Sequence, residues 1–378
     1  MRGLRFPVGA ALLLCGAVGC ARFELLGGGG EAGAGGSPPV GAGTSDGGSP
    51  ASGGGPTAGS PGNGGAPPCD EGTLDSDPFN CGSCGHDCHG GDCVGAICQF
   101  EELWQSSKAA PARFAQGVAV GSGRVVWVSD AGTLSLPVAA PANSEPLAHS
   151  YTEGTRVALR GPTIYRTWGT LITTPLSADA SVMNEDGVWG SGQCNYDLVI
   201  DDENDTYCVS IANDVGSVYR YNTSFSATMV ATSLPFAFGV EVDDQYFYVG
   251  YAGGIWRQEK PPSNVPGDDV VNVPVIGQLI RVGSDIYFGT SIGLARLDTI
   301  TGDAVVVYAD VAPNSIHVDA EHIWFTNQND DQVWRIDLDG QNPQTWGVGG
   351  GQPDVIAGND LFVFVTTNDD GRLTRLAK

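Results

Sequence analysis

The chain has 378 residues, which is room for two or three domains, and contains 56 glycines, 23 prolines and only 16% charged residues. Its formal net charge is −25. A surface this acidic repels phosphate groups, so nucleic acids and anionic lipid head groups are not expected partners, whereas cations and basic proteins remain open.

The first residues have the features of an export signal. Arg2 and Arg5 precede an apolar run that is too short to span a bilayer comfortably. Small residues follow this run and end at a cysteine. The order basic, apolar, small is that of a signal peptide that is removed on export.

Residues 17–20, Ala-Val-Gly-Cys, resemble a bacterial lipobox in which alanine replaces the usual leucine. The resemblance implies that residues 1–19 are a lipoprotein signal peptide and that Cys20 becomes the lipid-bearing first residue. Ala21 is not the aspartate that retains many lipoproteins at an inner membrane. The expected location is therefore the cell envelope, at the outer membrane or the cell surface. Cleavage with free secretion is the alternative.

Residues 20–68 are predicted to be a disordered, lipid-anchored tether. Residues 27–68 contain 18 glycines and 7 prolines, and Ser, Thr and Ala fill most of the rest. Such a segment has almost no apolar surface to bury, so it cannot offset the entropy of ordering. A flexible chain of this length has a root-mean-square span of roughly 35–40 Å.

Residues 69–98 are predicted to be a small disulfide module. Apolar residues are few there, so cross-links must replace a core. An even cysteine count and an oxidising compartment favour three disulfides of undetermined connectivity. Zinc is the alternative, because His86 and His89 accompany the thiols. The six cysteines are Cys69, Cys81, Cys84, Cys88, Cys93 and Cys98.

Within this module, residues 77–88 read Asp-Pro-Phe-Asn-Cys-Gly-Ser-Cys-Gly-His-Asp-Cys. This stretch resembles the DPxNCGxCGxxC signature of plant Stig1-like proteins and of many myxobacterial surface proteins. The resemblance covers only about 30 residues. It implies no catalytic role.

The remaining residues, 99–378, repeat with a period near 40. Aromatic residues mark each repeat at successive spacings of 38, 42, 40, 40, 37 and 38 residues. Four-stranded propeller blades have this length. The marker residues, expected to face the core, are Trp127, Tyr165, Tyr207, Phe247, Tyr287, Trp324 and Phe362.

Each repeat shows alternating apolar strands separated by Gly, Asp or Asn turns, which favours strands over helices. The seventh repeat ends after its third strand at residues 373–378. Residues 99–105 precede the first repeat and can pair there, closing the ring. The expected fold is all-β, a propeller of seven four-stranded blades, with six or eight as alternatives.

Acidic residues concentrate in the predicted turns, where Asp and Asn satisfy the backbone and tolerate positive φ. Turns between second and third strands carry Asp130, Asp214, Asp330, Asp331, Asp369 and Asp370. The opposite turns carry Asp201, Asp202, Asp243, Asp244 and Asp319. The first set predicts an acidic rim that attracts Ca²⁺ or a basic partner, at best weakly, and turn structure is the preferred interpretation. We therefore assign no metal site.

Residues 323–327, Ile-Trp-Phe-Thr-Asn, resemble the Tyr-Trp-Thr-Asp signature of YWTD propellers and the related NHL class, and residues 126–130 are a weaker echo. YWTD propellers usually have six blades, unlike the count expected here. The resemblance implies a platform for binding proteins or other ligands, usually without enzymatic activity.

Two functional classes compete. The favoured one is a non-enzymatic lipoprotein that presents the propeller as a binding or scaffolding platform for an unknown protein or carbohydrate and needs no cofactor. The alternative is a secreted lyase or hydrolase with its site at the channel mouth. The repeats contain only His149, His317 and His322, the first and last in predicted loops, and no nucleophile elbow, HExxH or phosphate loop. We assign no catalytic residue.

Cys194 and Cys208 are the only cysteines in the repeats, 14 positions apart. Both flank the first strand of the third repeat. Hairpin register places Cys208 beside Leu198, so Cys194 must fold back to reach it. The expected bond is a disulfide between these two residues.

Overall fold

The computed structural model is all-β apart from one 3₁₀ turn, η1 (Glu71–Thr73), over the residues that it describes. The predicted signal peptide and tether lie outside these residues. The described ranges are 71–83, 86–88, 91–105, 117–129, 131–150, 154–167, 169–177, 194–261, 265–349, 351–368 and 371–378.

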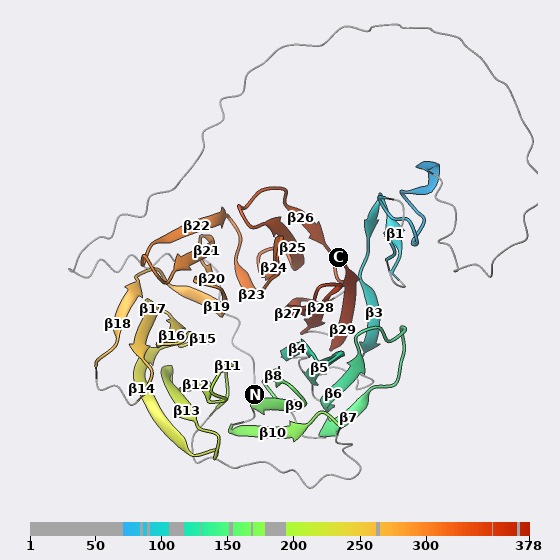
Figure 1. Cartoon of the computed structure of the whole chain (residues 1–378). Coiled ribbons are helices and arrows are strands. Elements are labelled where there is room, and N and C mark those ends of the chain that lie inside the picture. Colours follow the sequence, from blue (N-terminus) through green and yellow to red (C-terminus); the bar gives the residue numbers. More distant parts are fainter. Residues whose placement is uncertain are drawn as a thin grey trace, which may run out of the picture.

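Seven antiparallel sheets are arranged around a central axis and form a β-propeller, as the repeats predict (Figure 1). Blade one contains β4 (Gly117–Gly121), β5 (Arg124–Ser129), β6 (Gly132–Pro137) and β7 (Leu147–Ser150). Blade two contains β8 (Arg156–Arg160), β9 (Thr163–Thr167) and β10 (Leu171–Pro175). Blade three contains β11 (Leu198–Ile200), β12 (Thr206–Ala212), β13 (Val215–Tyr221) and β14 (Ala227–Pro235).

The second half of the ring has the same strand order. Blade four contains β15 (Gly239–Val242), β16 (Tyr246–Tyr251), β17 (Gly254–Glu259) and β18 (Asp268–Val271). Blade five contains β19 (Val275–Val282), β20 (Asp285–Thr290), β21 (Gly293–Asp298) and β22 (Ala304–Ala309). Blade six contains β23 (Pro313–Val318), β24 (His322–Asn327), β25 (Gln332–Asp337) and β26 (Gln344–Trp346). Blade seven contains β27 (Pro353–Gly358), β28 (Phe362–Thr367), β29 (Arg372–Ala377) and β3 (Glu101–Gln105).

The second strand of each blade contributes its side chains to the core. It has a strand on both sides and a neighbouring blade on both faces, so its side chains are removed from water. Rings also pack from blade to blade, as between Tyr207 and Phe247, whose centroids are 5.5 Å apart. Of the seven aromatic residues that mark the repeats, Tyr165 is half-buried, and the others are buried: Trp127, Tyr207, Phe247, Tyr287, Trp324 and Phe362.

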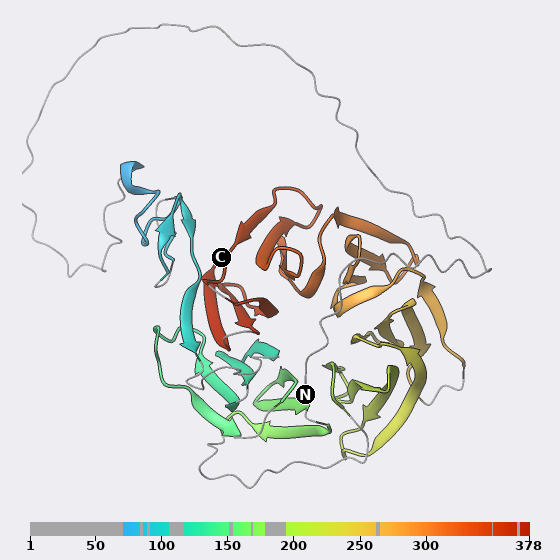
Figure 2. The same cartoon turned by 180° about the vertical axis from the view of Figure 1, so that it is seen from behind.

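Strand β3 closes the ring, as the displaced segment predicts. It pairs antiparallel with β29, with Glu101 opposite Arg375 and Trp104 opposite Leu373. Arg375 also forms an ion pair with the Glu101 carboxylate. Both views of the ring show β3 along the outer side of β29 (Figures 1 and 2). The outer edge of blade seven is therefore paired by residues from the other end of the repeats.

Polar contacts join adjacent blades at their innermost strands and at the residues that flank these strands. Each contact bridges two blades that also pack against each other through apolar side chains. Adjacent blades are therefore joined by hydrogen bonds near the ring axis as well as by the core. The bonds run from Ser122 Oγ to the Gly161 carbonyl (2.7 Å), from the Val240 N–H to Asp197 Oδ2 (3.1 Å), from Arg281 Nη1 to the Val242 carbonyl (3.0 Å) and from Ser315 Oγ to Gln278 Oε1 (3.0 Å).

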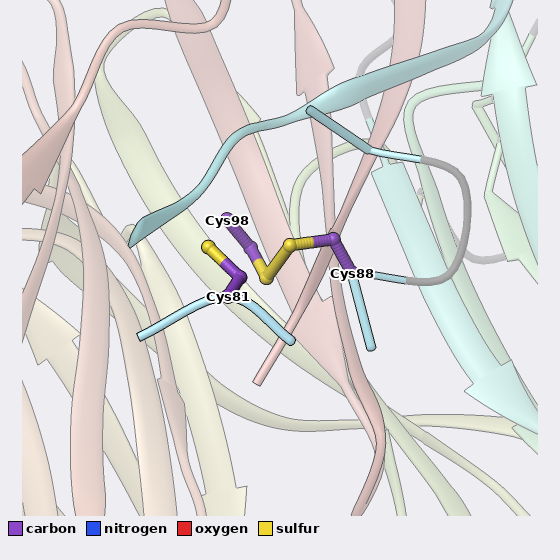
Figure 3. A group of neighbouring side chains, drawn as sticks. All are labelled: Cys81, Cys88 and Cys98. Atoms are coloured by element: carbon purple, nitrogen blue, oxygen red, sulfur yellow. A yellow bond between two sulfur atoms is a disulfide. The ribbon is translucent and has the colours of Figure 1, made fainter. Parts of the chain in front are cut away.

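The cysteine-rich segment is stapled by two disulfides, Cys81–Cys93 and Cys88–Cys98. They hold a short hairpin, β1 (Cys93–Val94) and β2 (Ile97–Cys98), that leads into β3. Figure 3 shows the sulfur of Cys81 beside the Cys88–Cys98 bond. The sulfurs of these three cysteines lie within 4.8 Å of one another, but the described ones are bonded to sulfur and so are not thiolates for zinc. Cys69, Cys84 and His89 lie outside the described residues.

This hairpin packs on blades six and seven. Trp346 Nε1 donates to the Cys98 carbonyl at 3.0 Å, and His86 Nε2 lies 3.2 Å from the main-chain oxygen of Lys378. The buried cysteines belong to the same hydrophobic cluster as Leu103 and Trp324. The stapled segment and the propeller therefore share one core.

Cys194 and Cys208 form a disulfide with Cα atoms 5.7 Å apart. Cys208 lies opposite Leu198 in the hairpin, as expected. Cys194 reaches it because the chain folds back before β11, where the N–H groups of Asn195 and Tyr196 both approach the Val209 carbonyl, at 3.3 and 3.1 Å. Among the described residues, no helix is long and apolar enough to cross a membrane.

Replacing Leu103 in β3 by alanine tests ring closure. Leu103 is fully buried, so Leu103→Ala should lower the free energy of unfolding by about 2–5 kcal/mol. Gln105→Ala, on the exposed position of the same strand, should change it by less than about 0.5 kcal/mol. Equilibrium denaturation in guanidinium measures both. An unchanged midpoint for Leu103→Ala would show that β3 does not stabilise the ring.

The double variant Cys194→Ser, Cys208→Ser tests the third disulfide. Losing a cross-link across 14 residues should cost about 3 kcal/mol of unfolding free energy, because the unfolded chain gains freedom. Urea denaturation of the oxidised proteins gives the difference. Peptide mapping of the non-reduced wild type is the control, and free thiols at both positions would contradict the bond.

Candidate functional site

The turns between first and second strands lie on one face of the ring, which we call the first-turn face. The antiparallel order places the turns between third and fourth strands on the same face. In blade four, Asp243 Oδ1 accepts the N–H groups of Gln245 (2.7 Å) and Tyr246 (2.6 Å). Asp201, Asp319 and Asn359 bind their own turns in the same way. At these positions the acids serve turn structure, as the preferred interpretation of the sequence has it.

In two blades the turn carboxylate also reaches the ring of the second strand five residues on. Tyr248 O–H donates to Asp243 Oδ2 at 2.7 Å, and Trp324 Nε1 donates to Asp319 Oδ2 at 3.0 Å. Burial raises the pKa of Tyr248, and the hydrogen bond to Asp243 adds to this. Each turn is thus fixed to a buried aromatic ring, which makes this part of the first-turn face rigid.

A groove of about 700 Å³ opens on the first-turn face between blades four and five. One wall comes from the turn between β15 and β16 and from β17, and the other from the end of β19 and the turn between β21 and β22. The lining residues, which we call the groove residues, are Asp243, Asp244, Gln245, Tyr246, Tyr248, Arg257, Arg281, Gly283, Ser284, Thr299 and Ile300.

Two arginines organise the groove. Arg257 places its guanidinium 4.8 Å from the centre of the Tyr246 ring and pairs with Asp268 Oδ2 at 3.1 Å. Arg281 donates to the Val242 carbonyl of the neighbouring blade at 3.0 Å. Stacking and ion pairing hold Arg257 in place, and the hydrogen bond to the neighbouring blade holds Arg281, so both side chains are already ordered before a ligand binds.

The groove also presents groups to solvent. Asp244 and Gln245 are exposed at the turn, and Ser284 is half-buried opposite them. Ile300 is 82% exposed and adds apolar surface at the edge of the groove. The site therefore combines hydrogen-bond donors, acceptors and apolar surface within one concave region, as small-molecule sites do.

Charged residues also lie in or next to the inner strands of the blades. Asp197 is 4% exposed, and burial raises its pKa to about 6 although Arg156 opposes the shift. Burial and then the nearby Asp197 charge raise the pKa of the half-buried Glu241 to about 8, against the pull of Arg281. Burial also raises the pKa of Asp354, which accepts a 2.8 Å hydrogen bond from Asn314. These carboxylates are costly to ionise where they are.

The three histidines of the repeats do not converge on the channel mouth. His149 lies in strand β7, not in a loop, fully buried with Nε2 2.7 Å from Ser135 Oγ. The loop prediction was wrong because residues 147–150 pair with β6. His322 begins β24 rather than lying in a loop, because it pairs opposite Asp337 on β25.

His317 faces its neighbouring blade. Its ring lies against Gly358 of β27, where a Cβ atom would come within 2.5 Å of Nε2. Burial lowers the pKa of His317 to about 4, and Lys378, 3.3 Å away, adds to this. Lys378 also binds Asp319 at 2.7 Å. Burial opposes ionisation of Asp319, but Lys378 and the turn N–H groups outweigh it and hold the pKa of the carboxyl well below its usual range.

The predicted acidic rim is only partly described, since Asp130, Asp369 and Asp370 lie outside the described residues. Both carboxylate oxygens of Asp330 accept hydrogen bonds from the strand that follows the turn. The donors are the Gln332 N–H (3.1 Å) and Trp334 Nε1 (2.9 Å). Asp214 and Asp331 adopt positive φ angles of 64° and 57°, which tight turns require.

A second acidic group, Asp201, Glu203 and Asp205, has carboxylate oxygens within 4.8 Å of one another. Cationic side chains already occupy it. Lys260 Nζ lies 3.0 Å from Asp201 Oδ2, and Arg220 forms an ion pair with Asp205. The positive charge that such a group attracts is thus supplied by the protein itself.

A small pocket of about 150 Å³ lies where the stapled hairpin meets blade six. Trp324 and Trp346 stack there with ring centres 5.4 Å apart, and Arg335 lies over both rings. His86 and Lys378 complete the wall. Because the pocket lies at the contact between the stapled hairpin and blade six, its residues pack these two parts of the chain together.

Sequence reasoning missed the groove. It assigned Asp243 and Asp244 to turns and Phe247 to the core, and it singled out neither Arg257 nor Arg281. The available signal was the alternation of Tyr246, Phe247 and Tyr248: Phe247 is fully buried in the core, whereas Tyr246 and Tyr248 line the groove, Tyr246 half-buried and Tyr248 buried below its hydroxyl.

No family model matches the sequence, and no curated protein matches it. Among solved structures, the fold resembles the CNH domain of AfRom2, with a TM-score of 0.57 at 10% identity over 74% of this chain and 99% of that one. A catalytically inactive histidine-to-alanine variant of virginiamycin B lyase from Staphylococcus aureus, with quinupristin, gives 0.56 at 9% over 74% and 99%. The WD40 β-propeller domain of Doa1 gives 0.54 at 13% over 73% and 96%. At such identities the likeness shows the fold alone.

The raised pKa of Glu241 predicts a pH dependence of stability. The folded chain keeps this proton up to about pH 8, whereas the unfolded chain loses it near the ordinary value of 4.5. Between these values the folded state binds more protons, so the free energy of unfolding falls as pH rises. Glu241→Gln should flatten this fall, measured by thermal melts from pH 4.5 to 8. Glu321→Gln, at an exposed turn, should melt as the wild type does; an unflattened Glu241→Gln profile would refute the assignment.

Proposed function

We propose that the protein is an exported, lipid-anchored lipoprotein that presents its propeller as a non-enzymatic binding platform. The observation that carries the binding role is the groove between blades four and five. It is concave, open to solvent and lined by side chains that are already held in place.

Export is supported by the chemistry of the cysteines. The three disulfides among the described residues fit an oxidising compartment outside the cytoplasm. The sequence around Cys20 supports lipid attachment, and the segment up to residue 68 provides the reach that lifts the propeller off a membrane. In this proposal the anchor confines the protein to the cell envelope, at the outer membrane or the cell surface.

Binding is favoured over catalysis because several acidic side chains and histidines are already engaged in hydrogen bonds or buried. Asp243 and Asp319 are saturated by turn N–H groups and aromatic rings, and His149 is fully buried. Catalysis by acid and base needs such groups within reach of a bound substrate. In the groove, the residues present groups suited to recognition instead.

The lipid anchor is tested at Cys20. In the native host, the wild type and the matched control Cys15→Ala should sediment with membranes and incorporate labelled fatty acid. Cys20→Ala should appear in the soluble fraction or remain unprocessed, because the acyl chains provide the attachment. If Cys20→Ala sediments with membranes as the wild type does, the anchor assignment fails.

The binding role is tested by capture from envelope extract on the immobilised full-length chain. Material retained by the wild type should be lost with Tyr246→Ala, which removes a groove wall. Phe236→Ala, a 43% exposed aromatic residue before blade four on the opposite face, is the matched control and should retain it. If both variants retain the same envelope material, binding does not occur in the groove, and the groove no longer supports the proposed binding role.

A further inference from the structure

We propose that the groove between blades four and five binds a neutral oligosaccharide, so that a glycan is the ligand that the platform presents or captures. This inference rests on the proposed binding function and names its ligand class. Four properties of the groove residues support it: their charge balance, their mixture of hydrogen-bonding groups, their apolar surface and their open form.

The groove is electrically balanced on a strongly acidic protein. Its charged lining consists of two carboxylates, Asp243 and Asp244, and two guanidinium groups, Arg257 and Arg281. The formal charges cancel, although the whole chain carries −25. The field of the entire acidic protein repels an anionic ligand. It attracts a cationic ligand, but the two guanidinium groups in the lining repel that ligand locally. The balance favours a ligand without net charge.

The hydrogen-bonding groups require a ligand that both donates and accepts. Asp243 is saturated by its turn and by Tyr248, so Asp244 is the carboxylate at the turn that remains as an acceptor. Gln245 and Ser284 both donate and accept, and the arginines only donate. Hydroxyl groups match such a mixed set, because each one gives a proton and accepts one.

The same groove offers apolar surface beside these polar groups. Tyr246 lines it with a ring fixed by Arg257, and Ile300 is 82% exposed at its edge. A sugar ring has C–H faces between its hydroxyls, and tyrosine provides an apolar body with a polar tip. A ligand in the groove can cover both the Tyr246 ring and the Ile300 side chain.

The size and form of the groove indicate an oligosaccharide rather than a single sugar. Its volume of about 700 Å³ lies in the upper part of the range typical of ligand sites, and it is open to solvent between two blades. Polysaccharide chains can lie across such a groove with both ends free. The tether predicted for residues 20–68 would let the propeller reach them.

The test is calorimetric titration of the full-length chain in detergent with chitohexaose, maltohexaose and cellohexaose. Polygalacturonate and a lysine-rich peptide serve as charged probes. We expect at least one neutral hexasaccharide to bind. Tyr246→Ala should weaken that binding at least about tenfold, because the apolar wall is lost, whereas Tyr246→Phe, which keeps the ring, should stay within about threefold.

Two controls separate binding from folding. Phe236→Ala, on the opposite face, should bind like the wild type, and all variants should show the wild-type melting temperature within a few degrees. If no neutral hexasaccharide binds, if only a charged probe binds, or if Tyr246→Ala binds as well as the wild type, the proposal is wrong. If envelope protein is still captured through the groove in that case, the binding platform stands and only its ligand class fails.

Discussion

The structure depends on the edge that blade seven would otherwise expose. Its sequence at residues 353–378 supplies three strands, and an unpaired strand edge leaves backbone N–H and C=O groups without partners and invites pairing with other chains. Strand β3 satisfies the edge from the other end of the repeats, with the Glu101–Arg375 ion pair fixing the register. The same strand makes the ring continuous, because Trp104 packs on Trp127 of blade one with ring centres 5.4 Å apart.

Ring closure also determines where the stapled segment sits. Because β3 follows β2 after only two residues, the disulfide hairpin is held at the outer side of blade seven (Figures 1 and 2). There it packs on Trp346 and against Lys378. The disulfides thus stabilise a segment that has few apolar residues of its own, and the propeller core provides the surface that it lacks.

A closed ring makes the first-turn face a rigid support. The polar contacts between inner strands keep adjacent blades in fixed relation, and the turn carboxylates tie loops to buried rings. The groove forms between two blades held in this way. A ligand that binds there has little protein motion to arrest, which lowers the entropy cost of binding. The carboxylates of Asp197 and Glu241 next to the inner strands carry an energetic cost, because burial disfavours their ionised forms.

The sequence by itself determined the propeller. The period near 40, the alternation of each strand and the acids at the turns are local properties, because neighbours along the chain set strand direction and turn geometry. Even the closing strand was foreseeable, since a missing fourth strand and a spare one can be counted. The pairing of the described cysteines and the strand position of His149 came only from the tertiary structure. So did the groove, whose Tyr246, Arg281 and Ile300 belong to two blades. Packing between blades decides which of these side chains come into contact, and the residue pattern along a single strand does not predict such contacts.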